Sequence, residues 1–404
     1  MTPQDIYRSK LVTADDAVDM IGSDMDVAMG MAIAEPPALL AALERRIVGH
    51  DLQDIRLWYF HSLEQAGKTV LRPDLLGRVR PHSMFLSSVE RALIKDDPEG
   101  GPYGAIDFVP VAFSESPHLL SEHVKLDACV TMVSPMDQHG WFTFGTSNDY
   151  TSTAARNAKR LIVEVNPNMP RVFGDSLLHV SEVDAIVEHA SPLAEVLCGT
   201  PSAEEQAIGR IIAGMIDDRA CLQMGIGTLP AAVCALLEDR RDLGIHTELM
   251  TPALARLIQC GAVTNKAKAT YRGRSVFTFA MGDAAFYEFL NDNPAFHSLP
   301  VHLVNDPRHI AKNDNVISVN ATLQVHLGGA CNSEQVMGRQ YSGAGGQLDF
   351  VRGATASRGG RSIIACQSTA RNGTVSRIVP TLDGPVTTPR NDTQIIVTEF
   401  GWVD

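Results

Sequence analysis

A glycine-rich run between Ser342 and Phe350 is the first place in this chain where the residue types point to chemistry. Gly343, Gly345 and Gly346 fall within four positions, and glycine costs backbone entropy unless the chain needs a positive φ or a close approach. Such a loop can aim several N–H groups at one anion, or at a carbonyl oxygen that becomes negative during a reaction. A tight turn between two strands is the alternative, because glycine is common in turns.

A second glycine loop, Gly225-Ile226-Gly227, follows a short apolar run and precedes a helix predicted to begin near Pro230. The N-terminus of a helix presents unpaired N–H groups and the positive end of its dipole, which suits a phosphate or an oxyanion. Pro230 stands where the third glycine of a dinucleotide-binding GxGxxG motif would lie, so that motif is only weakly indicated. A plain strand-to-helix turn is the alternative reading.

Glu248 lies just past a predicted short strand and is a candidate nucleophile. A lone glutamate at a strand end is usually solvated. Glu399, which also ends a predicted strand, and Glu334 are its rivals. The residue type alone does not decide which of the three glutamates is the nucleophile.

The elements that would position these residues occur twice along the chain. An apolar run, a glycine turn, a proline and an Ala/Leu-rich helix follow one another in residues 26–46 and again in residues 221–240. The two glycines, Gly30 and Gly225, lie 195 residues apart in a chain of 404. This order is typical of a strand–helix unit, and its recurrence favours an internal duplication over a chance match.

Short β runs alternate with helical stretches in both halves, which predicts an α/β fold with two similar open sheets. We expect an N-terminal domain over residues 1–190 and a C-terminal domain over 205–404. The polar, proline-containing stretch 191–204 is predicted to link them. Strands are predicted at 26–30, 54–60, 161–165, 221–225, 243–249, 276–279, 301–304, 362–366 and 394–398, and helices at 38–46, 207–216 and 230–240.

Composition narrows the class of protein. The net charge is −13, which argues against a nucleic-acid binder. No apolar stretch reaches membrane-span length, and the first ten residues lack the apolar core of a secretory signal. The seven cysteines are scattered singly, so we expect reduced thiols in a cytoplasmic protein and no metal site. No HExxH, P-loop or GxSxG string occurs.

Several longer motifs resemble one known family. They are Gly225-Ile226-Gly227 with Pro230, the run 243–248, Asn291-Asp292-Asn293-Pro294, the run 341–350, Ser376-Arg377-Ile378-Val379-Pro380, and Thr398-Glu399-Phe400-Gly401. The N-terminal half adds runs 133–140 and 164–170. With these motifs the chain is similar, from about Asp15 to its end, to class I acyl-CoA transferases of the acetyl-CoA hydrolase/transferase family. The chain is most similar to the 4-hydroxybutyrate CoA-transferase branch of this family. Within that branch it resembles the bacterial itaconate CoA-transferases most.

The resemblance implies an active site between the two domains, with Glu248 as a nucleophile that forms a glutamyl-CoA thioester in ping-pong catalysis. It places the Ile226 N–H on one side of the developing oxyanion and the Gly345 or Gly346 N–H on the other. Asn320 is expected to support Glu248 or the thioester carbonyl. Coenzyme A is then a substrate, no cofactor is bound permanently, and a homo-oligomer (a dimer or a dimer of dimers) is expected. Gly225, Gly227, Gly343 and Gln347 complete the expected binding set.

Two features depart from the family pattern. His326 stands where relatives usually carry an aspartate, which leaves the substrate branch open. Relatives also usually continue past the Thr-Glu-x-Gly motif, whereas this sequence ends at Asp404.

Acyl specificity is assigned to Met31, Phe60 and His61, which follow predicted strands of the first half. We expect these bulky side chains to restrict the pocket to short acyl chains, with His61 or an arginine near a second carboxylate; core packing is the alternative. Succinyl-CoA or acetyl-CoA is the expected donor and itaconate the expected acceptor. The alternatives are 4-hydroxybutyrate or butyrate as acceptor, hydrolysis of acetyl-CoA, or a sensor that binds a metabolite without turnover.

Overall fold

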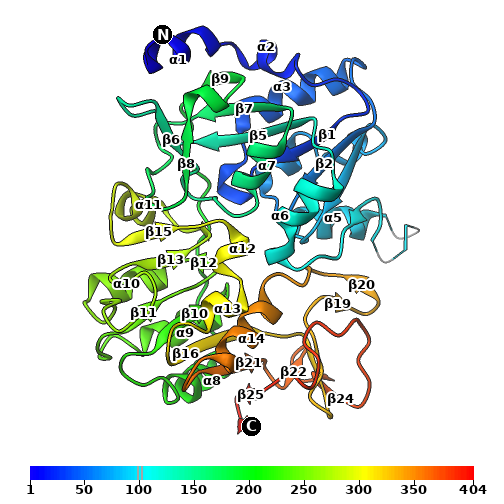
Figure 1. The fold of residues 1–404 in the computed structure, drawn as a ribbon. Helices are drawn as coiled ribbons and strands as arrows, with labels where there is room; N and C mark the ends of the chain where they lie inside the picture. Colours follow the sequence, from blue (N-terminus) through cyan, green and yellow to red (C-terminus); the bar gives the residue numbers. More distant parts are fainter. Residues whose placement is uncertain (98–99, 102) are drawn as a thin grey trace.

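The computed structural model describes residues 1–97, 100–101 and 103–404. Two α/β halves lie one above the other, the N-terminal half at the top of Figure 1 and the C-terminal half below it. Residues 189–202 pass between the halves without forming a helix or strand. The α/β class with two similar sheets is therefore confirmed.

A seven-stranded parallel sheet forms the centre of the N-terminal half, in the order β4-β3-β2-β1-β5-β7-β9. Val27 and Met29 of β1 pack in one hydrophobic cluster and Ala28 in another, so both faces of the sheet are buried. The strands are β1 (Asp26–Met29), β2 (Ile55–Tyr59), β3 (Val79–Ser83), β4 (Asp107–Phe108), β5 (Ala128–Val133), β7 (Arg160–Val165) and β9 (Ala185–Glu188), with the hairpin β6 (Trp141–Thr143) and β8 (Leu177–His179) beside them.

The helices of this half connect or flank these strands. The α-helices are α1 (Pro3–Lys10), α2 (Ala14–Val18), α3 (Pro37–Val48), α4 (Glu64–Lys68), α5 (Ser88–Asp96), α6 (Ser116–His118) and α7 (Thr151–Asn157); single turns of other helix types are η1 (Ala32–Ala34), η2 (Pro73–Leu75), η3 (Phe113–Glu115), η4 (Leu119–His123) and η5 (Val180–Glu182).

A six-stranded sheet in the order β11-β10-β16-β21-β25-β26 forms the centre of the C-terminal half. All its pairs are parallel except the edge pair β25 and β26. Its strands are β10 (Cys221–Met224), β11 (Gly244–Ile245), β16 (Val316–Ala321), β21 (Arg361–Ala365), β25 (Ile395–Thr398) and β26 (Gly401–Val403). The helices are α8 (Ala203–Ala213), α9 (Thr228–Ala235), α10 (Pro252–Gln259), α11 (Ala284–Leu290), α12 (Val301–Val304), α13 (Pro307–Ile310) and α14 (Gln347–Ala356).

Short strands complete this half in two- and three-stranded sheets. They are β12 (Leu249–Met250), β13 (Ser275–Phe277), β14 (Phe279–Ala280), β15 (Phe296–Ser298), β17 (Gln324–His326), β18 (Cys331–Asn332), β19 (Gln335–Val336), β20 (Arg339–Gln340), β22 (Thr369–Ala370), β23 (Val375–Ser376) and β24 (Ile378–Val379).

The two main sheets share one order of neighbours. In chain order, β1, β2, β5, β7 and β9 of the first half take the places that β10, β11, β16, β21 and β25 take in the second. In each half the first strand is followed by a glycine-containing turn and then by a helix, α3 or α9. This common topology is what an internal duplication predicts.

Three strand predictions are wrong in detail, and one alternative for the glycine run is excluded. Residues 301–304 form helix α12, not a strand, because Val301 and Val304 lie three apart and both become buried on one helical face. The predicted strand 243–249 is divided into β11 and β12, and 276–279 into β13 and β14. The Ser342–Phe350 loop joins β20 to α14, so the alternative of a turn between two strands is excluded.

The halves share a hydrophobic core. Met31 and Phe113 of the first half belong to the same buried cluster as Leu249 and Phe279 of the second. The rings of Phe113 and Phe279 meet edge to face, with centroids 5.9 Å apart. A backbone hydrogen bond of 3.0 Å from the Phe113 N–H to the carbonyl of Gly345 ties the glycine loop to the first half.

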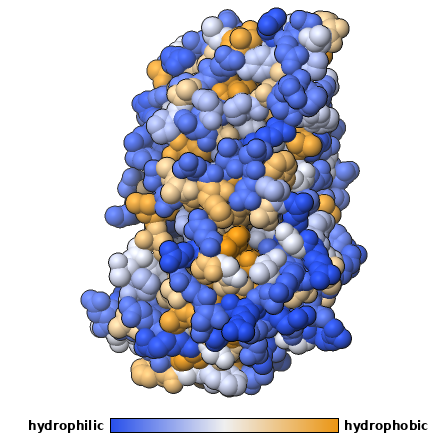
Figure 2. Space-filling model, turned by 90° about the vertical axis from the view of Figure 1, so that its left-hand side faces the viewer, coloured by the Kyte–Doolittle hydropathy of each residue, from blue (hydrophilic) through white to orange (hydrophobic). Residues whose placement is uncertain are grey.

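The molecular surface is of mixed character. On the face shown in Figure 2, hydrophobic residues lie singly or in small groups among hydrophilic ones. Of the described helices, none is both long and apolar enough to cross a membrane.

Candidate active site

Glu248 sits between β11 and β12, where the main sheet of the C-terminal half ends. Its carbonyl oxygen accepts hydrogen bonds from the N–H groups of Thr278 (3.1 Å) and Phe279 (3.2 Å). The preceding residue, Thr247, donates its N–H to the Val276 carbonyl at 3.0 Å. The backbone is therefore hydrogen-bonded on both sides of Glu248, which fixes the point from which its side chain extends.

The Glu248 carboxylate faces a small cavity of about 100 Å³ between the two halves. By liquid volume that is room for about three water molecules, so only a short acyl group fits without side-chain movement. The N-terminal half contributes Met31, Phe60, His61 and Phe85 to the wall; the C-terminal half contributes Gln223, Met224, Gly225, Ile226, Glu248, Leu249, Phe279, Met281, Asn320, Gly346, Gln347 and Phe350.

Burial raises the pKa of Glu248 to about 7, and the negative charge of Asp349 adds to this effect. Two donors oppose it: the amide of Asn305, whose Nδ2 lies 2.6 Å from Oε2, and the backbone N–H of Gly346. The carboxylate is thus held by a short hydrogen bond from Asn305, with the Gly346 backbone close by, in a site that disfavours its charge. A buried carboxyl with its pKa moved toward neutrality in a cleft is typical of a functional group.

Gly346 must lack a side chain where it stands. A Cβ on this residue would overlap both Glu248 Oε2 and Asn305 Nδ2. Gly346 directly precedes α14, so its N–H lies at the N-terminal end of that helix. The close approach predicted for the glycine run therefore occurs at Gly346, against the predicted nucleophile.

Gly225 and Ile226 of the second glycine loop form another part of the wall. Gly227 has φ +111° and immediately precedes α9, as expected for a strand-to-helix turn that needs glycine. Ile226 is 56% exposed in spite of its apolar side chain. A large apolar side chain exposed beside the cavity is well placed to contact a bound ligand.

The side chains from the N-terminal half are aromatic and packed against one another. Phe60 stacks between Phe85 and Phe113, with ring centroids 5.5 Å and 4.0 Å away. Core packing was the alternative to cavity lining for Met31 and Phe60. Both residues are buried in the core and also line the cavity. Burial lowers the pKa of His61, although the charge of Glu90 acts in the opposite sense.

Of the predicted site residues, nine line this cavity and three do not. Gly227 lines a neighbouring cavity, while Gly343 and Gly345 pack against the backbone of Met84 and the ring of Phe85. The nine are Met31, Phe60, His61, Gly225, Ile226, Glu248, Asn320, Gly346 and Gln347.

Asn320 lies in the wall but is bonded to other residues. Its amide exchanges hydrogen bonds of 3.3 Å with Gln223 and donates to Ser318 Oγ at 2.9 Å. The amide that holds Glu248 belongs to Asn305, which the sequence analysis missed because Asn-Asp-Pro resembles an ordinary turn. Gln223 was also missed, although a polar residue in the apolar run 221–224 was a usable signal.

The rival glutamates are engaged elsewhere. Glu399 accepts hydrogen bonds from the N–H (2.8 Å) and hydroxyl (2.5 Å) of Ser368, which help to lower its pKa against the effect of burial. Glu334 accepts from the Thr387 hydroxyl at 2.8 Å. Neither is among the described residues that line the cavity, and His326 is not among them either.

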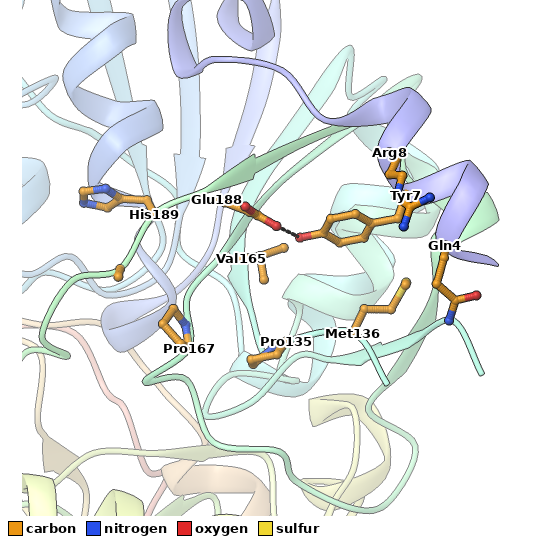
Figure 3. A pocket seen from close by; sticks show the side chains of 10 residues that line it. Gln4, Tyr7, Arg8, Pro135, Met136, Val165, Pro167, Glu188 and His189 are labelled. Carbon is orange, nitrogen blue, oxygen red and sulfur yellow. Dashed lines mark hydrogen bonds between the residues drawn. The ribbon is translucent and has the colours of Figure 1, made fainter. Parts of the chain in front are cut away.

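Two larger cavities help to define the site. One of about 400 Å³ shares Gly225, Ile226, Leu249 and Met281 with the Glu248 cavity and extends toward residues 196–198. The other, of about 650 Å³, lies under α1 in the N-terminal half. Figure 3 shows its wall, where the Tyr7 hydroxyl donates to Glu188 at 2.7 Å. This cavity shares no described residue with the Glu248 cavity, so we do not assign the chemistry to it.

A metal centre is not evident in the described part of the chain, which contains no group of three or more His, Cys, Asp or Glu side chains placed to hold an ion. The site is instead a carboxylate between two glycine loops in a two-domain α/β protein.

Comparisons with known proteins identify the family to which this two-domain α/β chain belongs. Residues 1–197 match the acetyl-CoA hydrolase/transferase N-terminal domain, and residues 282–404 match the C-terminal domain of the same family. The chain belongs to the acetyl-CoA hydrolase/transferase family. The expected family is thereby confirmed.

Three relatives illustrate how close the similarity is. Succinyl-CoA:cyclohexane-1-carboxylate CoA transferase of Geobacter metallireducens is 42% identical over 98% of this chain and 88% of its own length. The 4-hydroxybutyrate coenzyme A transferase of Clostridium kluyveri is 40% identical over 98% of this chain and 91% of its own length. The crystal structure of RipA from Yersinia pestis superposes with a TM-score of 0.95 at 54% identity, covering 100% of this chain and 92% of that one.

Proposed function

We propose that this protein is an acyl-CoA:carboxylate CoA-transferase that works through a thioester on Glu248. The observation that carries the proposal is the Glu248 carboxylate itself, which faces a small interdomain cavity whose wall includes Gly346 and Ile226. A protein that only binds a metabolite has no need of a carboxylate with a raised pKa in this position. The family membership and the CoA-transferase relatives support the same reaction.

The reaction proceeds in four balanced exchanges. The Glu248 carboxylate attacks the donor thioester and gives an acyl-glutamyl anhydride and CoA thiolate. The thiolate attacks the Glu248 carbonyl, forms the glutamyl-CoA thioester and releases the donor carboxylate. The acceptor carboxylate then attacks this thioester and expels the thiolate, leaving a new anhydride. The thiolate takes the acceptor acyl group and frees Glu248.

Each exchange places a negative charge on a carbonyl oxygen. Backbone N–H groups at Ile226 and Gly346 are our candidates for stabilising it. The Gly346 backbone lies beside the Glu248 carboxylate, where the carbonyl of the glutamyl anhydride or thioester would form. Loss of one such donor typically raises the barrier by about 3 kcal/mol.

We assign the pantetheine arm of CoA to the 400 Å³ cavity. This cavity joins the Glu248 cavity along Gly225 and Ile226, so a thioester carbonyl beside Glu248 would direct its arm there. Its wall is largely apolar, including Pro230, Ala231 and Leu249, which suits an uncharged arm.

Itaconate is our first choice of acceptor, with succinyl-CoA or acetyl-CoA as donor. The cavity fits a short carbon skeleton, and His61 offers a ring nitrogen to a second carboxylate. The similarity to a 4-hydroxybutyrate coenzyme A transferase favours 4-hydroxybutyrate as the second candidate. A panel of itaconate, 4-hydroxybutyrate, butyrate, acetate and water with succinyl-CoA and acetyl-CoA tests this order. If 4-hydroxybutyrate or water gives a higher kcat/KM than itaconate, that acceptor replaces itaconate as the assigned one.

The covalent step has its own test. The protein is mixed with acyl-CoA and then reduced with borohydride. The mass of the peptide that contains Glu248 should then show a covalent change. An unlabelled protein would reject the transferase and favour a sensor.

The pH dependence follows from the raised pKa of Glu248. The ionised carboxylate is the nucleophile, so kcat/KM is expected to fall about tenfold per pH unit below a midpoint near pH 7. A carboxyl with its ordinary pKa of 4.5 would keep most of the activity at pH 5. Initial rates between pH 5 and 9, with stability checked at each pH, measure the midpoint. A flat profile down to pH 5 would contradict the burial of the nucleophile.

Truncating Met31 should change acceptor preference. Met31→Gly removes a fully buried side chain from the cavity wall. One methylene of pocket space typically discriminates by about 10-fold or more. We therefore expect kcat/KM for butyrate relative to acetate to rise by about 10-fold. Met25→Gly, outside the cavity wall, serves as the control, and an unchanged preference in Met31→Gly would show that Met31 is only a core residue.

A further inference from the structure

His246 is a buried histidine that the proposed reaction does not use. It follows β11, lies two residues before Glu248, and is not among the described residues that line the Glu248 cavity. Its N–H donates to the carbonyl of Leu222 at 3.1 Å, and its main chain forms a β-bridge with Val276. The main chain is therefore fixed to β10 on one side and to β13 on the other, so the ring extends from a fixed point.

The hydrogen bond of the ring defines its tautomer. Nε2 lies 2.8 Å from the carbonyl oxygen of Val304. Burial lowers the pKa of His246 to about 3, and the charges of Lys268 and His309 act in the same sense, so the ring is neutral. A neutral imidazole carries one N–H and a carbonyl only accepts, so we assign the proton to Nε2 and none to Nδ1.

The unprotonated nitrogen of this ring has no partner. Nδ1 is buried and makes no hydrogen bond to any of the described residues. A buried acceptor without a partner destabilises the folded state, whereas an apolar side chain of similar size would not. Packing alone would therefore favour leucine over His246. What histidine adds at this position is the hydrogen bond from Nε2 to Val304.

The carbonyl of Val304 ends helix α12. This helix is a single turn of four residues, and a helix so short is not stable by itself. The last carbonyls of a helix lack partners within it, and histidine side chains can supply them. The buried His246 ring does this for Val304, and the half-buried His309 ring lies 3.2 Å from the carbonyl of Leu303.

The residue that follows α12 is the hydrogen-bond partner of the nucleophile. Asn305 Nδ2 lies 2.6 Å from Glu248 Oε2. The bond from His246 to Val304 and the bond from Asn305 to Glu248 close a ring through two short pieces of main chain, 246–248 and 304–305. This ring fixes the Asn305 amide relative to the strand end that carries the carboxylate.

The His246 ring also packs against the helix that follows Gly346. Its centroid lies 6.3 Å from the ring centroid of Phe350, in an edge-to-face arrangement. Phe350 donates its N–H to the Gly346 carbonyl at 3.1 Å and lines the Glu248 cavity. His246 therefore lies where three parts of the site meet: the strand end with Glu248, the end of α12 and the start of α14.

We propose that His246 is a positioning residue for Glu248: its Nε2–H holds the Val304 carbonyl and so fixes the segment whose next residue, Asn305, binds the carboxylate. This inference rests on the proposed function, since it concerns how the nucleophile of that reaction is held. The role requires a donor at Nε2 and no charge on the ring.

The test compares two substitutions of the same residue. His246→Leu removes the donor, and kcat should fall about 100-fold with little change in KM for the acyl-CoA, the loss typical of a reacting group displaced by about 1 Å. The Asn305 hydrogen bond acts to lower the pKa of Glu248, so its loosening should also move the acid limb of kcat/KM to higher pH. His246→Gln supplies an amide N–H and should restore most of kcat and the parent acid limb.

His309→Leu is the matched control, because it removes the other histidine contact with α12. His309 is half-buried, so water can replace its contact, and kcat should stay within about twofold of the parent value. Four results would each overturn the positioning role: an unchanged kcat in His246→Leu, a raised KM with unchanged kcat in that variant, an equal loss in His309→Leu, or an equal loss in His246→Gln.

A measurement on the parent protein decides if His246→Leu does not fold. With nitrogen-15-labelled histidine, the ring signal that His246→Gln lacks should show a protonated Nε2 and no titration between pH 5 and 9. A ring that titrates in this range, or that carries its proton on Nδ1, would overturn the inference. Labelling of Glu248 in the parent protein separates the two failures: no label defeats the proposed function, whereas a label with parent kinetics in His246→Leu defeats only this inference.

Discussion

Glu248→Gln is expected to reduce CoA transfer by five to six orders of magnitude, about the loss that follows removal of a catalytic nucleophile. The amide of glutamine cannot form the anhydride or the thioester, although its oxygen can still accept the Asn305 hydrogen bond. The fold should be unharmed. Burial raises the pKa of Glu248, so its ionisation opposes folding at pH 8, and the neutral amide is expected to give an equal or higher Tm there. Steady-state rates and thermal unfolding at pH 8 measure both.

A matched control is the same change at an exposed site of the same half. Glu238 forms a surface ion pair with Arg256 (3.1 Å), and such pairs contribute little to stability. Glu238→Gln should therefore keep full activity. Glu248→Gln with more than a hundredth of the parent rate, or a label on the peptide of Glu334 or Glu399, would transfer the assignment to another glutamate.

Gly346→Ala should cost about 100-fold or more in kcat with the fold retained. The added Cβ would overlap both Glu248 Oε2 and Asn305 Nδ2, so the carboxylate must leave its place. A displacement of about 1 Å at a reacting group is sufficient for a loss of this size. The backbone of Gly346 has φ −99°, outside the left-handed region that favours glycine, so the main effect comes from contact with the site.

Gly77→Ala is the control for this variant. Gly77 is exposed and a Cβ there would have nothing within 4 Å, so its activity and Tm should match the parent. Near-normal kcat in Gly346→Ala would mean that Glu248 reacts from a different position, and would remove the Gly346 N–H from the proposed oxyanion donors.

Most of the local structure was predictable from the sequence. The strands β1, β2, β7, β10, β21 and β25 lie within about one residue of their expected bounds, because buried parallel strands read as short apolar runs with glycine at their ends. Helix α12 was not predictable in this way. Four residues carry too little periodicity to separate helix from strand, and the burial of Val301 and Val304 decided it.

The site likewise has features that were predictable from the sequence and features that were not. The sequence by itself determined the class of protein, the glutamate and the two glycine loops, since these depend on residue types in order along the chain. Only the tertiary structure decided that Gly346, of the three loop glycines, approaches Glu248, and that Asn305, 57 residues further along the chain, donates a hydrogen bond to it. Contacts between residues so far apart depend on how the two sheets and their loops pack, and no local pattern records that packing.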